Sequence, residues 1–192
     1  MPKFAFKALV VAASLAVLVP QFARADDVTD EIDRARKAYE AGNIADAKTA
    51  LEVAAQMIGQ QKAKALQTVL PAPLSGWSAK DGEPTSASTS MFGGGISASR
   101  TYENGDKDCV VSIIGDSPML AMVSMVLTNP SMAGMSGARV VPLGERHAMI
   151  TQQGEVQLMS SNNYLVSVTG SCEEEDKLAY AQAVDYKKLA GF

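Results

Sequence analysis

Methionine is the residue whose type and spacing point most directly to chemistry in this sequence. Met119, Met122 and Met125 recur at every third position of a segment with helical composition, so their thioethers line one side of the expected helix. Thioether sulfur binds Cu(I), whereas methionine more commonly fills irregular gaps or forms adaptable apolar surfaces. We interpret the row first as a packing or partner-binding surface and second as a Cu(I) site.

A second group of sulfur and nitrogen ligands follows from strand register. In the expected strands 147–151 and 155–159, the apolar residues share one face only if Ile150 pairs with Val156. The opposite face then pairs His147 with Met159 and Met149 with Gln157, which brings together one imidazole and two thioethers. This patch is an alternative Cu(I) or Ag(I) site, although a histidine beside methionine at a surface is more often without such a role.

The two cysteines, Cys109 and Cys172, lie at the start of one expected strand and just beyond the end of another. If those strands run antiparallel side by side, the sulfur atoms meet and form a disulfide in an oxidising compartment. Closing this long loop stabilises the fold by about 4 kcal/mol on the chain-entropy model. The alternative is a reactive thiolate at Cys172, and the negative charges of residues 173–175 oppose it.

Gly115-Asp116-Ser117 follows an expected strand and resembles the nucleophile block of the SGNH hydrolases. That family also requires a GxND block and a DxxH block, and this sequence has neither beside its single histidine. A nucleophile without a positioned base is not activated. We therefore expect Ser117 or Asp116 to cap the next helix, and a serine hydrolase is kept only as a third alternative.

The elements that position these groups begin after residues 1–25, which predict an export signal. Lys3 and Lys7 precede the apolar run 8–19, and Ala23-Arg24-Ala25 places small residues at the positions that a signal peptidase reads. The run is shorter than the roughly 20 residues that cross a bilayer, so we expect no membrane anchor after cleavage. The expected location is periplasmic or secreted.

Cleavage also changes the charge of the chain. Of 192 residues, removing 25 leaves 167, and of 17 basic residues, removing Lys3, Lys7 and Arg24 leaves 14 against 21 acidic ones, a net charge of −7. An acidic surface gains nothing from the counterion release that drives binding to phosphate backbones. Nucleic acid and anionic lipid are therefore excluded as expected partners.

Residues 26–70 predict an antiparallel helical hairpin. Apolar residues recur at helical spacing on both sides of Gly42-Asn43, where the first helix ends and Asn43 caps the second. The expected inner face of the second helix consists of Ile44, Ala47, Leu51, Ala54 and Ile58. The stretch 35–54 resembles one tetratricopeptide-type repeat, but without a second copy we expect a single packing hairpin rather than a solenoid.

Residues 71–192 predict an antiparallel sheet covered by helices, which makes the whole chain α+β. A period of two indicates seven strands, at residues 85–91, 96–103, 108–114, 139–143, 147–151, 155–159 and 164–169. The short turns between them favour a meander. One helix is expected over 117–128, and a last one begins at Ser171, which has capping-box spacing to Glu174.

The helix expected over 117–128 is apolar nearly all round, whereas a helix that lies on a sheet needs only one apolar face. Its outer side, with Met119, Met122 and Met125, is therefore expected to be covered. The N-terminal hairpin, a partner protein or a ligand could each supply that cover.

The order of elements from Trp77 to Phe192 resembles the sandwich fold of the Mog1 and PsbP families. The segments LPxPLxGW at 70–77 and MFGGGxSASRxY at 91–102 resemble uncharacterised exported proteobacterial proteins, a resemblance that implies no chemistry. We expect a periplasmic, non-catalytic binding or adaptor protein without a cofactor, whose partner is a protein or other envelope component and which is compatible with homo-oligomerisation. A Cu(I)-binding protein and a serine hydrolase are the alternatives.

Overall fold

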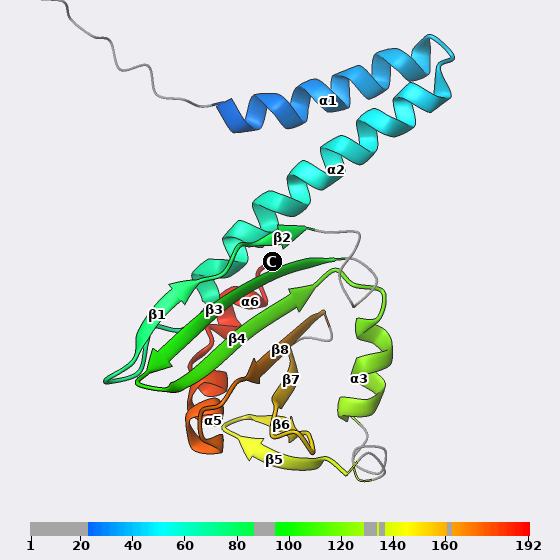
Figure 1. Ribbon diagram of the computed structural model, residues 1–192. Coiled ribbons are helices and arrows are strands. Elements are labelled where there is room, and N and C mark those ends of the chain that lie inside the picture. The colour runs from blue at the N-terminus through cyan, green and yellow to red at the C-terminus, as the bar shows by residue number, and fades with distance from the viewer. Residues whose placement is uncertain (1–22, 87–94, 129–133, 135–136, 161–162) are drawn as a thin grey trace, which may run out of the picture.

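The computed structural model describes residues 23–86, 95–128, 134, 137–160 and 163–192. The methionines at 91, 132 and 135 lie outside these ranges, and so does the predicted export signal apart from residues 23–25. Within them the chain forms a helical pair followed by an eight-stranded antiparallel sheet with further helices, which confirms the α+β class (Figure 1).

The helical pair consists of α1 (Ala23–Glu40) and α2 (Ile44–Leu66), followed by the 3-10 turn η1 (Gln67–Val69). Gly42 has a φ of +77°, a conformation that costs glycine little and lets the chain reverse. Asn43 caps α2, because its side-chain oxygen accepts a hydrogen bond from the Asp46 amide at 3.2 Å. Both the predicted turn and the predicted cap are confirmed.

The hairpin projects from the sheet instead of lying on it (Figure 1). Only the C-terminal half of α2 docks, over β2 (Thr85–Ser86) and β3 (Ile96–Asn104). The approach is close at Gly59, where an added Cβ would lie 3.1 Å from the Ser86 Cβ. The expected docking of the hairpin on the sandwich is therefore found for the end of α2 alone, and α1 and the first half of α2 extend beyond the sheet (Figure 1).

The sheet has the order β1-β3-β4-β8-β7-β6-β5, and β2 pairs with β3 as well. The remaining strands are β1 (Ser78–Asp81), β4 (Lys107–Gly115), β5 (Arg139–Leu143), β6 (Arg146–Ile150), β7 (Val156–Ser160) and β8 (Tyr164–Thr169). Six of the seven predicted strands are found with ends within one residue of the prediction. For the seventh, predicted at 85–91, the structure has β2 at its first two residues, and positions 87–91 lie outside the described residues. Strand β1 was not predicted from the sequence.

The predicted meander is wrong, because β8 lies between β4 and β7. After β4 the chain passes through α3 (Leu120–Thr128) to the far edge of the sheet, and β5 to β8 then return toward β4. Tyr164, Leu165 and Val166 are three consecutive buried residues of β8. A strand that is buried on both faces belongs in the middle of a sheet, which explains this position.

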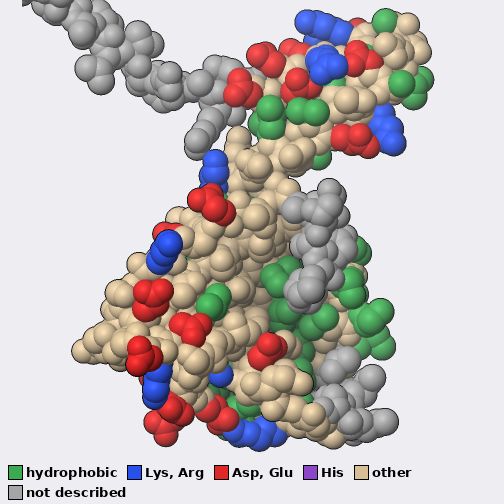
Figure 2. Space-filling view, viewed as in Figure 1, with side chains coloured by type: hydrophobic (Ala, Val, Ile, Leu, Met, Phe, Trp, Pro, Cys, Tyr) green, Lys and Arg blue, Asp and Glu red, His purple; other side chains and the backbone are tan. Residues whose placement is uncertain are grey.

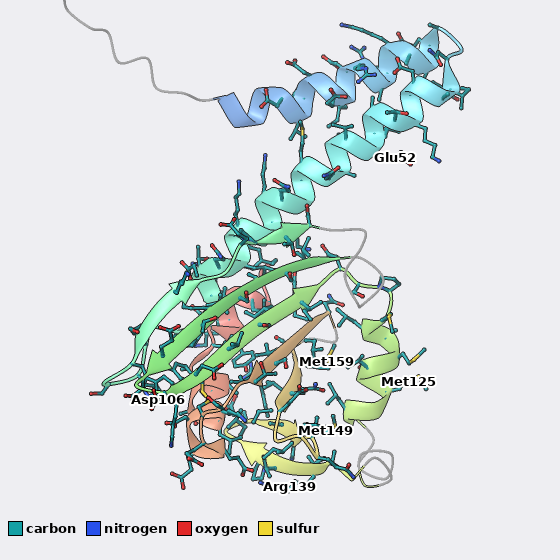
Figure 3. The ribbon with its side chains drawn as sticks, viewed as in Figure 1. Glu52, Asp106, Met125, Arg139, Met149 and Met159 are labelled. Atoms are coloured by element: carbon teal, nitrogen blue, oxygen red, sulfur yellow. A yellow bond between two sulfur atoms is a disulfide. The ribbon has the colours of Figure 1, made fainter. Side chains whose placement is uncertain are left out.

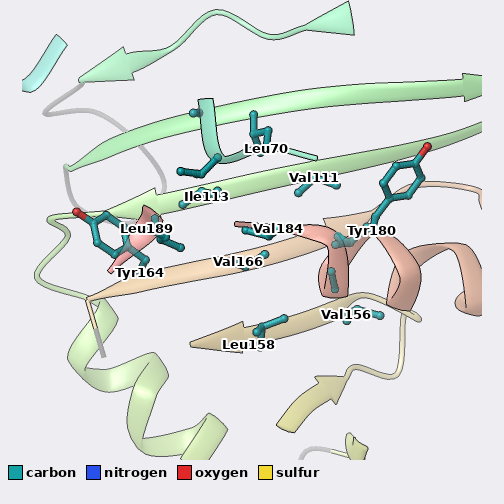
Figure 4. Close-up of a cluster of buried hydrophobic side chains, with 14 of the residues drawn as sticks. Leu70, Val111, Ile113, Val156, Leu158, Tyr164, Val166, Tyr180, Val184 and Leu189 are labelled. Atoms are coloured by element: carbon teal, nitrogen blue, oxygen red, sulfur yellow. The ribbon is translucent and has the colours of Figure 1, made fainter. Parts of the chain in front are cut away.

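The main core lies between one face of the sheet and a layer formed by the end of α2, η1, α5 (Glu174–Ala183) and α6 (Tyr186–Leu189) (Figures 1 and 4). The rings of Tyr102 and Tyr180 stack at 4.0 Å, and Trp77 meets Tyr180 edge-on at 5.8 Å. The buried Tyr102 hydroxyl donates to the Pro71 carbonyl at 2.6 Å. Burial raises the pKa of Tyr102 to about 12, so it stays neutral.

The N-terminus of α5 differs from the predicted capping box. Glu173 is the N-cap residue and makes no capping hydrogen bond through its side chain. The Ser171 hydroxyl instead donates to the Asp108 carboxylate and accepts from the Asp108 amide. The predicted box between Ser171 and Glu174 is therefore wrong, because Ser171 ties the end of β8 to the start of β4.

Candidate functional site

Helix α3 packs on the face of the sheet opposite the main core. Side chains alternate along a strand, so Leu165 points away from the core face to which Tyr164 and Val166 contribute. Leu165 is nevertheless buried, as is Leu120 on α3. The expectation that one side of this helix lies on the sheet is confirmed.

The outer side of α3 is open among the described residues. Met119, Met122 and Met125 have exposed fractions of 38%, 65% and 65%, and Met125 points away from the sheet in Figure 3. Figure 2 shows hydrophobic side chains gathered at this edge of the molecule. The hairpin does not cover the row, because α1 and the first half of α2 project away from α3 (Figure 1). The first of the three expected covers is therefore excluded.

The turn that leads into α3 is built by Asp116 and Ser117. Asp116 adopts a φ of +54° and accepts hydrogen bonds from Lys62 of α2 at 2.8 and 3.0 Å. Burial is the largest single influence on Lys62 and disfavours its charge, but the interactions with Asp116 and Tyr164 together outweigh it, so the net pKa of Lys62 is raised. The Ser117 hydroxyl oxygen accepts from the Met119 amide at 3.3 Å, and its carbonyl accepts from the Leu120 amide at 3.1 Å, so Ser117 builds a turn before the helix. The helix itself begins at Leu120, three residues later than predicted.

The structure does not bring the serine and the histidine together. His147 lies on β6, three strands away from β4, which corresponds to about 14 Å across the sheet. Ser117 follows β4 directly and is itself buried. The geometry that a serine hydrolase requires between nucleophile and base is thus absent between these two residues.

The second predicted ligand group is only partly assembled. Ile150 pairs with Val156, which confirms the predicted register, but the ladder between β6 and β7 extends over two residue pairs and ends before His147. His147 is exposed and pairs with Pro142 of β5, whereas Met149 is buried and Met159 half-buried on the α3 side. The predicted pairing of His147 with Met159 is therefore wrong, because β6 leaves β7 after the turn.

The two cysteines form the predicted disulfide. Cys109 on β4 and Cys172 after β8 have Cα atoms 5.4 Å apart, because β4 and β8 are antiparallel neighbours. The Cys172 amide also donates to the Asp108 carbonyl at 2.9 Å. The alternative of a reactive thiolate at Cys172 is thereby excluded in this structure.

Charged groups surround the disulfide without forming a metal site. Hydrogen bonds from the Ser171 side chain and backbone lower the pKa of Asp108, and Lys107 lowers the pKa of Glu173 by a hydrogen bond. Within the described ranges, no group of three or more His, Cys, Asp or Glu residues is placed to hold a metal ion. Nor is any helix of those ranges long and apolar enough to cross a membrane.

Sequence reasoning missed a second apolar surface, which lies on the hairpin. The predicted inner face of α2 is split, since its alanines are buried and its larger residues are exposed. The exposed apolar side chains of the two helices are Ile32, Tyr39, Ile44, Leu51 and Ile58. The sequence did contain a sign of this surface, because alanines recur at helical spacing beside the larger apolar residues on both helices.

Comparison of the chain with protein-family models, with curated proteins and with solved structures gave no match in any of the three. The resemblances to the Mog1 and PsbP sandwich and to a tetratricopeptide-type repeat therefore stay predictions. The candidate site is defined by the geometry of α3 and its methionine row.

Proposed function

We propose that this protein is an exported, non-catalytic binding protein, and that it docks a protein of the cell envelope against the outer side of α3. The observation that carries the proposal is the exposed row of Met119, Met122 and Met125. Methionine is unbranched and polarisable, so a row of such side chains adapts to the shape of an apolar partner. Apolar side chains gathered at a surface are typical of interaction sites.

The support beneath the row favours binding over chance exposure. Leu120 is buried against the sheet face that contains Leu165 and Met149, so α3 is held by its inner side while its outer side is presented. A surface on a fixed element loses less conformational freedom on binding than a surface on a loop. The methionine side chains can adapt while the helix axis stays in place.

Export to the periplasm or beyond is the second part of the proposal. The disulfide between Cys109 and Cys172 is typical of an oxidising compartment. The predicted signal at residues 1–25 supplies a route to it. The net charge of −4, or −7 after cleavage, favours a protein partner over nucleic acid or anionic lipid.

The test places a photo-crosslinking residue at Ala121, which is exposed beside Met122, in the protein exported by living cells. The crosslinked protein is identified by mass spectrometry and purified, and its Kd for this protein is measured. Met122→Asp should weaken binding at least tenfold, because a charge would enter an apolar contact. Gln182→Asp, at an exposed position of α5, should leave the Kd unchanged.

Two results would contradict the proposal. One is crosslinking from Ala121 that does not exceed crosslinking from position 182. The other is a partner whose Kd is the same for Met122→Asp and for the unmodified protein.

Cu(I) binding is a second candidate function, because Met119, Met122 and Met125 are three exposed thioethers spaced by three residues, the first in the turn before α3 and the others on it. Replacing all three by Leu separates the two functions, since Leu keeps the apolar surface and removes the sulfur. A copper protein should lose its rise in thermal midpoint with Cu(I) or Ag(I) in this variant, whereas protein docking should persist. His147→Ala tests the second predicted ligand group in the same assay.

A further inference from the structure

The two helices of the hairpin contact each other through alanine. Ala35 and Ala38 of α1 and Ala47, Ala50 and Ala54 of α2 are all buried. Small side chains let the helices approach closely, but they bury little apolar area. Large apolar side chains would stabilise the pair more, and the sequence contains them at neighbouring positions. Those residues are turned away from this alanine contact, the seam between α1 and α2.

The large apolar residues follow a repeat of seven. Ile44, Leu51 and Ile58 are spaced by seven on α2 and are 61%, 55% and 49% exposed, and Ile32 and Tyr39 are spaced by seven on α1 and are 47% and 69% exposed. A seven-residue repeat keeps side chains on one side of a helix and is the pattern of helices that pack along their length. Each helix therefore has a stripe that suits a second neighbouring helix.

Both stripes lie on the same face of the hairpin. At about 100° per residue, the α2 stripe lies about 65° around the helix from its alanine contact, and the α1 stripe lies about 80° from its own, in the same rotational sense along each helix. Because the helices are antiparallel, these rotations turn both stripes to one side. The other side is polar: Arg34 forms an ion pair with Asp46 across the two helices, above a cleft that Asp30, Asp33 and Lys37 line.

We propose that the hairpin joins two copies of this chain, stripe against stripe, in a four-helix bundle. In such a bundle each helix packs against two neighbours on adjacent sides, and separations of about 65° and 80° place the alanine seam and the stripe on adjacent sides of each helix. When this face packs on the same face of a second copy about a two-fold axis, the stripes of α1 and α2 are both covered. The projection of the hairpin beyond the sheet leaves this face accessible (Figure 1).

The exposed area fits a second copy. Exposed fractions near one half on five large side chains leave roughly 500 Å² of apolar surface per copy, which is at the upper end for a patch on a monomer. Two copies together bury roughly 1,000 Å², the size at which specific interfaces begin. Contacts at the rim of the stripes add to this area.

The charge of the hairpin favours protein over membrane as the occupant. From Asp27 to Leu66 there are seven acidic and six basic residues, so the segment is almost neutral. The two signs are mixed along the hairpin in Figure 2. Helices that lie on anionic membranes carry an excess of Lys and Arg on their polar face.

The test is sedimentation equilibrium of the full exported chain from Asp26 to Phe192 over a range of concentrations. The expected result is a dimer that dissociates on dilution. Leu51→Asp should raise the dissociation constant about a hundredfold or more, because each dimer loses two buried leucines and gains two charges. Leu51→Met keeps the apolar contact and should retain the dimer.

Two control variants make the test specific. Gln56→Asp introduces the same charge at an exposed position of α2 outside the stripe and should leave the dimer intact. Met125→Asp should also leave it intact, so that failure of this inference and failure of the α3 proposal are distinguishable. Leu51→Asp also supports the proposal if it loses helical circular dichroism along with the dimer, provided that Gln56→Asp loses neither.

A wild-type chain that is monomeric at about 100 μM, where interfaces of this size associate, would overturn the proposal. So would a dimer that Leu51→Asp leaves unchanged. Binding of the monomeric chain to anionic vesicles, abolished by Leu51→Asp, would assign the stripe to a membrane surface and overturn it too.

Discussion

The sandwich and the hairpin place their large apolar side chains in opposite ways. In the sandwich, Tyr102, Ile113 and Leu158 are inside, and the core continues from the sheet to the helices that cover it (Figure 4). In the hairpin, alanines are inside, and isoleucine, leucine and tyrosine are outside. A helical period in the sequence therefore indicates that a face will be covered, but it does not identify what covers it.

The difference has an energetic consequence. Burial of a large side chain stabilises a fold by about 1.5 to 3 kcal/mol, whereas an alanine contributes only one methyl group. The sandwich can therefore be stable by itself, and the hairpin has little stability beyond the propensity of its helices and the docking of α2. The predictions below test this contrast, from the largest expected effect to the smallest.

Removing the disulfide should have the largest effect, and it should act on the sandwich. The bridge closes a loop with a sequence separation of 63, which gives about 4 kcal/mol on the chain-entropy model. The variant with Cys109→Ala and Cys172→Ala should lose about that much free energy of unfolding in urea. Because α2 docks on the sheet, the helical signal of the hairpin should be lost before or together with the sheet. A helical signal that persists after the sheet has unfolded would contradict the contrast.

A matched pair of isoleucines compares the two regions directly. Ile113 is completely buried in the sandwich, and Ile58 is half exposed on the hairpin. Ile113→Ala should cost about 3 kcal/mol, because it removes buried methylene groups and leaves a cavity. Ile58→Ala should cost less than about 0.5 kcal/mol in dilute monomer. Equal costs in urea unfolding would contradict the contrast.

Enlarging an alanine tests the seam between α1 and α2. Ala54 is buried between the helices, whereas its neighbour Ala55 is exposed. Ala54→Leu should destabilise the hairpin by about 2 kcal/mol, because the closely packed seam has no room for the longer side chain. Ala55→Leu is the control, and thermal unfolding followed by circular dichroism compares them. A seam that accepts leucine at 54 without cost would mean that the helices are not held together by close contact.

Acid should weaken one junction of the sandwich by a small amount. Hydrogen bonds from Ser171 lower the pKa of Asp108, so the folded state favours the charged carboxylate. This stability is present above the ordinary value of about 3.9 and is lost as the pH falls through the lower folded-state pKa. Asp108→Asn should therefore be less stable than the wild type near neutral pH and should approach it in acid. A difference in urea midpoint that is constant from about pH 2 to pH 6 would rule out this linkage.

The strands of the sandwich were predictable because each has one face on the core. Alternation located six strands within one residue, and the register of Ile150 with Val156 followed from the same pattern. The order of the strands was not predictable from turns. The disulfide between Cys109 and Cys172 contained that information, since it requires β4 beside β8 and a meander does not allow this.

The candidate site was predictable in its residues but not in its surroundings. The spacing correctly placed Met122 and Met125 on one side of a helix, whereas Met119 lies in the turn before it, and the exposure of all three depends on where α2 leaves the sheet. That direction involves contacts between residues far apart in sequence, such as the close approach of Gly59 to Ser86. For the same reason, the sequence did not show that Leu51 and its neighbours would be left outside.

The packing of Trp77 against Tyr180 gives the molecule an internal reporter for one of its two regions. Trp77 is the single tryptophan of the chain, and it lies at the base of the main core, while the hairpin between Ala23 and Leu66 contains Tyr39 as its one aromatic side chain. Tryptophan fluorescence will therefore follow the sandwich and be insensitive to the hairpin, whereas circular dichroism in the far ultraviolet will follow both. If the two optical signals change at different temperatures, the interval between them measures how independently the projecting helices melt.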